Sequence, residues 1–455
     1  MDDTLETRIG EWRAAVLRGP AVDAADADEL EGHLREQVSD LRAAGLTESE
    51  AFLVAVRRLG EVDSITAEFA REHSDRLWKQ LAMSRPEEDR RQPLLTMLAF
   101  AALAVVLLQG ARLIAVATNT ADQWFLGDPV AEWFLRNLAF FVLPVLVAYF
   151  VVLRRMPWRR VLPLAAVVVA LVVAVNLFPF APDSNTELLV AIHLPVLLWF
   201  VVGAAYVGGD VRSPARRMDF IRFTGEWAIY FALIVLGGGV LIGLTVAVLT
   251  PIAPDAIEQV ITWVLPSGGT AAVIVAAWLV EAKKSIIENL APVLTAIFTP
   301  LFAVMLLASA VVYTVAGIGR DFDRDLLTVF DLLLLVVLSL VVYGVSARDS
   351  TRPAGVMDVI RLVAVVAAII LDILVLVSMF ARVGEFGFTP NRVAALGLNL
   401  VLLVNLAGTA WFVVRQLTGR APAVRLERWQ TGYIPVFAVW VALVVVALPP
   451  LFDFA

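Results

Sequence analysis

The chain changes character near residue 93, from a charged N-terminal part to one apolar run after another. The first run, 93–117, reads PLLTMLAFAALAVVLLQGARLIAVA and contains a single charged residue, Arg112. About 20 apolar residues in a helix cross the hydrocarbon core of a bilayer. Because a helix satisfies its own backbone hydrogen bonds in lipid, the pattern predicts a bundle of transmembrane helices.

The apolar runs predict about eleven spans. After 93–117 they are 130–153, 161–178, 188–207, 227–249, 261–280, 290–316, 326–343, 356–380, 393–414 and 433–448. The predicted fold class is all-α. We expect a helical domain over 1–83, an exposed linker over 84–92, and a transmembrane domain over 93–455.

Apolar residues recur at helical spacing in the N-terminal part as well, which indicates amphipathic helices. This spacing predicts helices over about 2–17 and 23–44, a third helix after a capping box at Thr47 and Glu50, and a fourth from about 62 to 83. Gly45 should end the second helix, with Leu46 packing back on Leu41. The expected core residues are Leu34, Val38, Phe52, Val56 and Leu59.

Two stretches resemble known bacterial families. Residues 30–60, LEGHLREQVSDLRAAGLTESEAFLVAVRRLG, resemble permease prefix domain 1, which is related to the HAAS-type domains of membrane proteins. That resemblance implies a regulatory or docking module, and a helical cap on the first span is the alternative. Residues 385–411, EFGFTPNRVAALGLNLVLLVNLAGTAW, are similar to the membrane family called domain of unknown function 4153, which implies a fold and no activity.

Composition narrows the protein class. The chain is 60% hydrophobic and 17% charged, whereas soluble domains are about 25% charged. Its net charge of −7 comes from the first 92 residues, which hold 21 acidic and 13 basic side chains. An acidic domain disfavours nucleic acid as a partner. The chain has no cysteine, which removes thiolate catalysis and cysteine metal sites, and no signal-peptide pattern follows Met1.

Basic residues collect in alternate loops. One set of loops holds Arg154, Arg155, Arg159, Arg160, Arg212, Arg216, Arg217, Arg222, Lys283, Lys284, Arg348, Arg352, Arg415, Arg420, Arg425 and Arg428. The other set holds Arg320, Arg324, Arg382 and Arg392. Loops rich in Lys and Arg stay in the cytoplasm. We therefore predict a multi-pass protein of the inner (plasma) membrane, with the N-terminus inside and the C-terminus outside.

No catalytic signature is found in the sequence. It lacks the P-loop, the dinucleotide-binding glycine pattern, HExxH and GxSxG. The three histidines lie far apart in the chain, so we expect no metal, no cofactor and no catalytic residue. Gly239 and Gly243 permit close helix contact, either within the bundle or between two copies. The segment 265–269 is expected to be an interfacial turn or, as the alternative, a broken helix at a binding site.

Ionisable residues inside the spans give the candidate ligand site. They come from five spans and lie at similar depth near the predicted outer end: Arg112, Arg136, His193, Asp331 and Asp372. Charged groups within a membrane are costly and are usually paired. One hypothesis is an outward-opening pocket in which the two arginines neutralise the two aspartates. The alternative is five separate groups that extend toward the interface.

These features favour a membrane-embedded regulatory or sensory protein with a cytoplasmic helical docking domain. The alternative is a transporter or permease subunit for an unknown solute, supported by the number of spans. A membrane enzyme is the least favoured class. The expected partners are the lipid bilayer and a cytoplasmic protein that binds residues 1–83.

Overall fold

The computed structural model describes most of the chain as helix. The described residues are 5–16, 24–43, 46–59, 87–118, 129–182, 184–282, 290–315, 324–346, 348 and 354–455. They form two compact units, Met1–Leu94 and Leu95–Ala455, and contain no β-strand. Eleven of the described helices are long and apolar enough to cross a membrane, which confirms the all-α polytopic prediction.

The N-terminal unit contains three described helices around a small core. They are α1 (Leu5–Val16), α2 (Ala24–Ala43) and α3 (Glu48–Leu59). Leu34 and Val38 are buried as predicted, at 0% and 2% exposure. Phe52 and Val56 are only half-buried at the edge of the core, because small alanines at the preceding positions of α3 are fully buried there. The Leu59 side chain and the predicted helix over 62–83 lie outside the described residues.

The turn between α2 and α3 has the predicted chemistry. The Leu46 N–H donates to the Leu41 carbonyl at 3.2 Å, the backbone bond of a Schellman end. Glu50 accepts from both the N–H and the hydroxyl of Thr47, at 3.0 and 2.6 Å. The second of these bonds differs from a capping box, because the hydroxyl donates to the carboxylate instead of accepting from the backbone.

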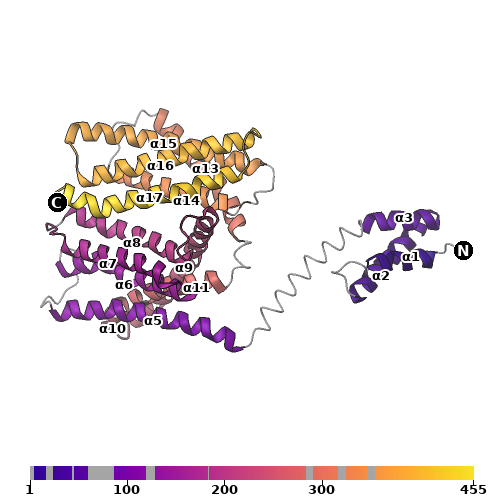
Figure 1. The fold of residues 1–455 in the computed structure, drawn as a ribbon, viewed down its shortest axis with the longest axis horizontal. Coiled ribbons are helices and arrows are strands. Elements are labelled where there is room, and N and C mark those ends of the chain that lie inside the picture. The colour runs from indigo at the N-terminus through magenta and orange to yellow at the C-terminus, as the bar shows by residue number, and fades with distance from the viewer. Residues whose placement is uncertain are drawn as a thin grey trace. The chain divides into compact units, whose positions relative to one another are not determined.

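The second unit is a bundle whose long helices run largely alongside one another (Figure 1). Its helices are α5 (Glu87–Thr118), α6 (Pro129–Leu153), α7 (Trp158–Leu177), α8 (Asn185–Tyr206), α9 (Pro214–Leu249), α10 (Asp255–Gln259), η1 (Val260–Val264), α11 (Leu265–Ala282), α13 (Leu290–Val315), α14 (Arg324–Ser346), α15 (Val356–Phe386), α16 (Pro390–Leu417), α17 (Val424–Ala442), η3 (Leu443–Ala447) and α18 (Leu448–Leu451). Because α5 begins at Glu87, the predicted linker is helical from that residue onward.

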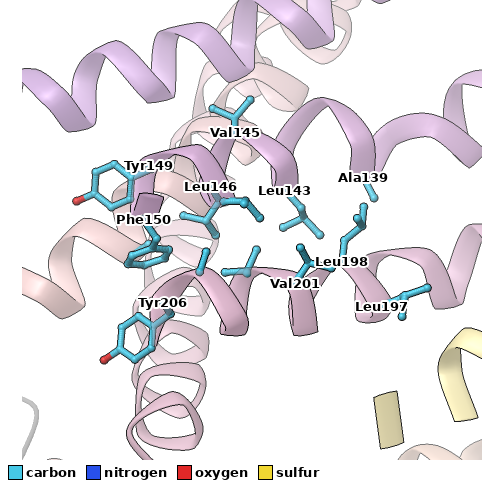
Figure 2. Packing of buried hydrophobic residues seen from close by; sticks show 14 of the residues in the cluster. Ala139, Leu143, Val145, Leu146, Tyr149, Phe150, Leu197, Leu198, Val201 and Tyr206 are labelled. Atoms are coloured by element: carbon cyan, nitrogen blue, oxygen red, sulfur yellow. The ribbon is translucent and has the colours of Figure 1, made fainter. Parts of the chain in front are cut away.

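The bundle has two main hydrophobic cores. The first is centred on α6 and α8, with α9 and α11 packed beside them. Figure 2 shows Leu143 and Leu146 of α6 above Leu198 and Val201 of α8. The second core joins α13, α14, α15 and α16. The helix α17 lies between the two, in contact with α8 and α9 of the first group and with α14 and α16 of the second.

Both alternatives for the segment 265–269 are wrong, and so is the expected packing of Gly239 and Gly243 within the bundle. The segment 265–269 is neither a turn nor a break, because α11 begins at Leu265 and continues through it. The irregular part is instead the π-helical stretch η1 just before it. Gly239 and Gly243 of α9 do not pack within the bundle, because no described atom lies within 4 Å of a Cβ built on either glycine.

Candidate functional site

A cavity of about 600 Å³ lies among α8, α14, α15 and α16, next to the start of α8. Its lining residues include Asn185, Leu188, Leu189, Ile192, His193, Leu327, Thr328, Asp331, Met379, Arg382, Thr389, Asn391, Arg392, Ala394, Ala395 and Leu398. We call this space the His193–Asp331 cavity. Two of the five predicted site residues therefore face the same space, from two different helices.

Asp331 is held in place by an asparagine of a neighbouring helix. The Asn399 side-chain amide donates to the Asp331 carboxylate at 2.8 Å and to the Ala395 carbonyl at 2.9 Å. Asn399 has no exposed surface, so its geometry is set by the packing of α16 against α14 and α15. The amide thus supplies a neutral donor to the carboxylate, in place of the arginine that the sequence suggested.

Asp372 of α15 is not among the lining residues of the cavity and lies inside the protein. It has 0% exposure, and neither carboxylate oxygen has a hydrogen-bond partner among the described residues. Asp331 is close enough to act on it electrostatically. The two aspartates therefore lie on neighbouring helices that pack together, Asp331 lining the cavity and Asp372 buried in the apolar core of α13 to α16.

His193 approaches the cavity from α8. Its Nδ1 lies 2.8 Å from the Leu189 carbonyl oxygen, one helical turn earlier. Because a carbonyl only accepts, Nδ1 must carry the proton, which assigns the tautomer and leaves Nε2 as the position where a second proton can bind. A histidine held in this way can change charge without losing its orientation.

The two predicted arginines do not neutralise the two aspartates. Arg136 of α6 forms an ion pair with Glu187 in the first turn of α8, and its guanidinium lies 5.0 Å from the centre of the Phe180 ring. Glu187 is not among the predicted site residues because it lies just before the predicted span 188–207. It is 51 positions from Arg136, so the pairing depends on the packing of α6 on α8 and has no local signal in the sequence.

Arg112 of α5 has a structural role near η1. Its guanidinium donates to the Thr262 carbonyl at 2.6 Å and lies 4.8 Å from the centre of the Trp263 ring. Pro266 follows Thr262 by four residues and has no N–H to donate to that carbonyl. Arg112 therefore binds a backbone acceptor that cannot receive the usual i+4 bond of an α-helix.

The cavity is also lined by two arginines that the sequence pattern assigns to loops between the predicted spans. Arg382 is on α15, and Arg392 is in the first turn of α16. Arg392 donates to the carbonyls of Phe386 and Gly387 at 3.0 and 2.8 Å, which holds the turn that closes one side of the cavity. The proximity of this turn to His193 and Asp331 depends on helix packing and has no signal in the sequence.

At the other end of the bundle, charged residues form pairs. Asp358 binds Arg361, three residues later on α15, at 2.9 Å, and also Arg348 at 3.1 Å. Arg154 binds Glu281 at 2.9 Å. A smaller cavity of about 220 Å³ also lies at this end, lined by Arg154, Tyr206, Val207, Arg216, Asp219, Arg222, Phe223 and Glu226.

Among the described residues, no group of three or more His, Asp or Glu side chains is placed to hold a metal ion. No model of a known family, no curated protein and no solved structure matches this chain. The family resemblances of 30–60 and 385–411 therefore stay predictions from the sequence.

Proposed function

We propose that this chain is a membrane-embedded regulatory or sensory protein whose input is a proton that enters the His193–Asp331 cavity. The observation that carries the proposal is a pair of aspartates on two helices that pack together. Asp331 of α14 lines the cavity, and the fully buried Asp372 of α15 has no hydrogen-bond partner among the described residues. An ionised carboxylate in that position is costly, and two neighbouring carboxylates add repulsion.

Protonation would change the forces between neighbouring helices. Asp331 belongs to α14 and Asp372 to α15, and these helices share one apolar core with α13 and α16. Adding a proton removes a charge from that core, so the protonated and ionised states favour different packing. Such a pair is suited to serve as the bistable element of a switch.

The helix α8 is the route by which such a change would reach the other end of the bundle. It carries His193 in the first cavity and ends at Tyr206, which lines the smaller cavity. Between them, α8 packs tightly on α6 through the core drawn in Figure 2. Close-packed side chains transmit displacement because they have no free volume to absorb it.

The proposed output is the N-terminal helical unit, acting as a docking module for a cytoplasmic protein. The resemblance of 30–60 to permease prefix domain 1 supports this part. Specific capture of one cytoplasmic protein by the isolated unit would favour regulation.

The input can be tested with a reporter on the cavity wall. Because the natural chain has no cysteine, Ile192→Cys introduces a unique thiol for an environment-sensitive fluorophore. Val196→Cys is the matched control, one turn further along α8, exposed and outside the cavity lining. In nanodiscs titrated from about pH 8 to about pH 5, the range in which histidine-like groups respond, we expect a change at 192 and little at 196.

Substitutions of the two aspartates test whether the pH response comes from this pair. Asp372→Asn and Asp331→Asn preserve shape and remove the titrating group, so each should reduce the response or shift its midpoint. A response that both substitutions leave unchanged contradicts the proposal. Proton or solute flux in proteoliposomes that requires Asp372 would instead support a transporter or permease subunit.

A further inference from the structure

An apolar groove follows the boundary between the two cores. It has a volume of about 590 Å³ and lies among α9, α13 and α14. Ile229 and Leu236 of α9, Phe298 of α13, and Leu335 and Val336 of α14 are among its lining residues. We call it the seam groove, because α9 packs on the first core whereas α13 and α14 belong to the second.

The groove opens on a helix surface with little protein cover. Beyond Glu226, α9 buries no side chain, and Leu236 is 67% exposed. The same part of α9 is the most apolar window of its span, with a mean hydropathy of 2.6. A concave apolar surface at this depth is therefore in contact with the hydrocarbon phase.

One end of the groove is marked by a positive charge. The Arg222 Nε donates to the Ser346 carbonyl at 2.7 Å, which links α9 to the end of α14. Arg222 precedes Gly225 and Ile229 of the groove by three and seven residues, so all three lie on one face of α9. The Arg222 side chain is exposed and also lines the smaller cavity, together with Asp219 and Glu226.

The length of the groove matches one leaflet. From Gly225 to Leu236 the rise of α9 is about 16 Å at 1.5 Å per residue. Half of a hydrocarbon core of about 30 Å is about 15 Å. A single acyl chain therefore matches the length and the apolar character of the groove. An anionic headgroup at the interface would then lie near Arg222.

We propose that the seam groove is a binding site for one anionic phospholipid, with an acyl chain along α9 and α14 and the headgroup phosphate at Arg222. The lipid would fill the space between the two cores, and its phosphate would add a negative charge beside the Arg222 guanidinium at the bilayer surface. This inference is independent of the proposed proton input, because it involves neither aspartate.

Native mass spectrometry of the full-length protein tests the site with phosphatidylglycerol and phosphatidylcholine of equal chain length. A basic residue near an anionic surface contributes about 1 kcal/mol, so Arg222→Gln should weaken phosphatidylglycerol binding about fivefold. Arg212→Gln, an exposed arginine at the same end of the bundle but outside the groove, is the matched control. Arg222→Lys keeps the charge and should retain binding, which separates the headgroup contact from the bond to Ser346.

A second variant tests the groove itself. Ala232→Trp places a large side chain within the lining of the groove, whereas Ala247→Trp places it on an exposed part of α9 outside that lining. The Ala232→Trp variant should no longer retain bound phosphatidylglycerol or phosphatidylcholine, whereas the Ala247→Trp variant should retain both as the natural protein does. Equal lipid binding by the Ala232→Trp and Ala247→Trp variants, or by the Arg222→Gln and Arg212→Gln variants, overturns the proposal. So does a natural protein of twice the chain mass that Ala232→Trp converts to a monomer, because a second copy would then occupy the groove.

Discussion

Gly397→Ala should disturb the packing of α16 on α17 and destabilise the bundle. Gly397 lies directly under the Trp440 ring, and a Cβ at this position would overlap three ring carbons. Trp440 packs at the edge of a small core with Ala394 and Val444, so the ring must move or the helices must part. The position matters for the candidate site because Asn399, which binds Asp331, follows two residues later on α16.

The magnitude follows from two opposing terms. Extra methyl groups in a packed interior cost about 1–3 kcal/mol. Replacing a helical glycine by alanine returns about 0.5–1 kcal/mol through lower backbone entropy in the unfolded chain. Because the overlapped atoms belong to a rigid indole ring, we expect the steric term to win, with a net loss of about 1–2 kcal/mol.

Gly432→Ala is the matched control on α17, because a methyl group added there would have no described atom within 4 Å. That variant should gain about 0.5–1 kcal/mol from the same entropic term. Unfolding of the full chain in mixed micelles measures the change in unfolding free energy for each variant. The change should be a loss for Gly397→Ala and a gain for Gly432→Ala. The double variant Gly397→Ala, Trp440→Leu should recover part of the loss. A Gly397→Ala protein as stable as Gly432→Ala would refute the steric reasoning.

Three further predictions concern the N-terminal unit and the topology. Leu34→Ala should cost about 2–5 kcal/mol in chemical unfolding of this unit, because Leu34 is fully buried. Hydrogen bonds from Thr47 lower the pKa of Glu50, so their stabilisation is present above the unfolded value of about 4.3 and is lost as the pH falls through the lowered folded value. Circular dichroism from pH 6 to pH 2 should show this loss in the natural unit and a smaller one in Glu50→Gln. Reporter fusions at Ala455 and within 154–160 should lie on opposite sides of the membrane, and the same side for both would contradict the predicted orientation.

The number of spans was predictable because it depends on local composition. A helix needs about 20 apolar residues to cross a bilayer, and each run carries that information within itself. Local turns were predictable for the same reason, as with the bond from Leu46 to Leu41. The segment 265–269 was predicted wrongly, because the expected effect of its proline and glycines appears one turn earlier, in η1.

Partner choice inside the bundle was not predictable from one sequence. Arg136 and Glu187 are 51 positions apart and meet only because α6 packs on α8. Arg112 and Thr262 are 150 positions apart, and Arg112 binds a carbonyl, a group that every residue has. Depth in the membrane was therefore a sound signal that these residues need partners, but it contained no information about which partners they find.

The hydrogen-bond or ion-pair partner of each candidate residue distinguishes the groups with a structural role from the functional candidate. Arg112 donates to a backbone carbonyl, Arg136 binds a glutamate, His193 binds a carbonyl, and Asp331 accepts from an amide. Each of these contacts explains how the group is tolerated within a membrane. Asp372 has no such contact among the described residues, although it is the most deeply buried of the five. A structural role does not explain a carboxyl group there, because an apolar residue of similar size would avoid the cost. Its presence in the same core as Asp331 is accounted for by the proposed function, in which this pair gains and loses a proton.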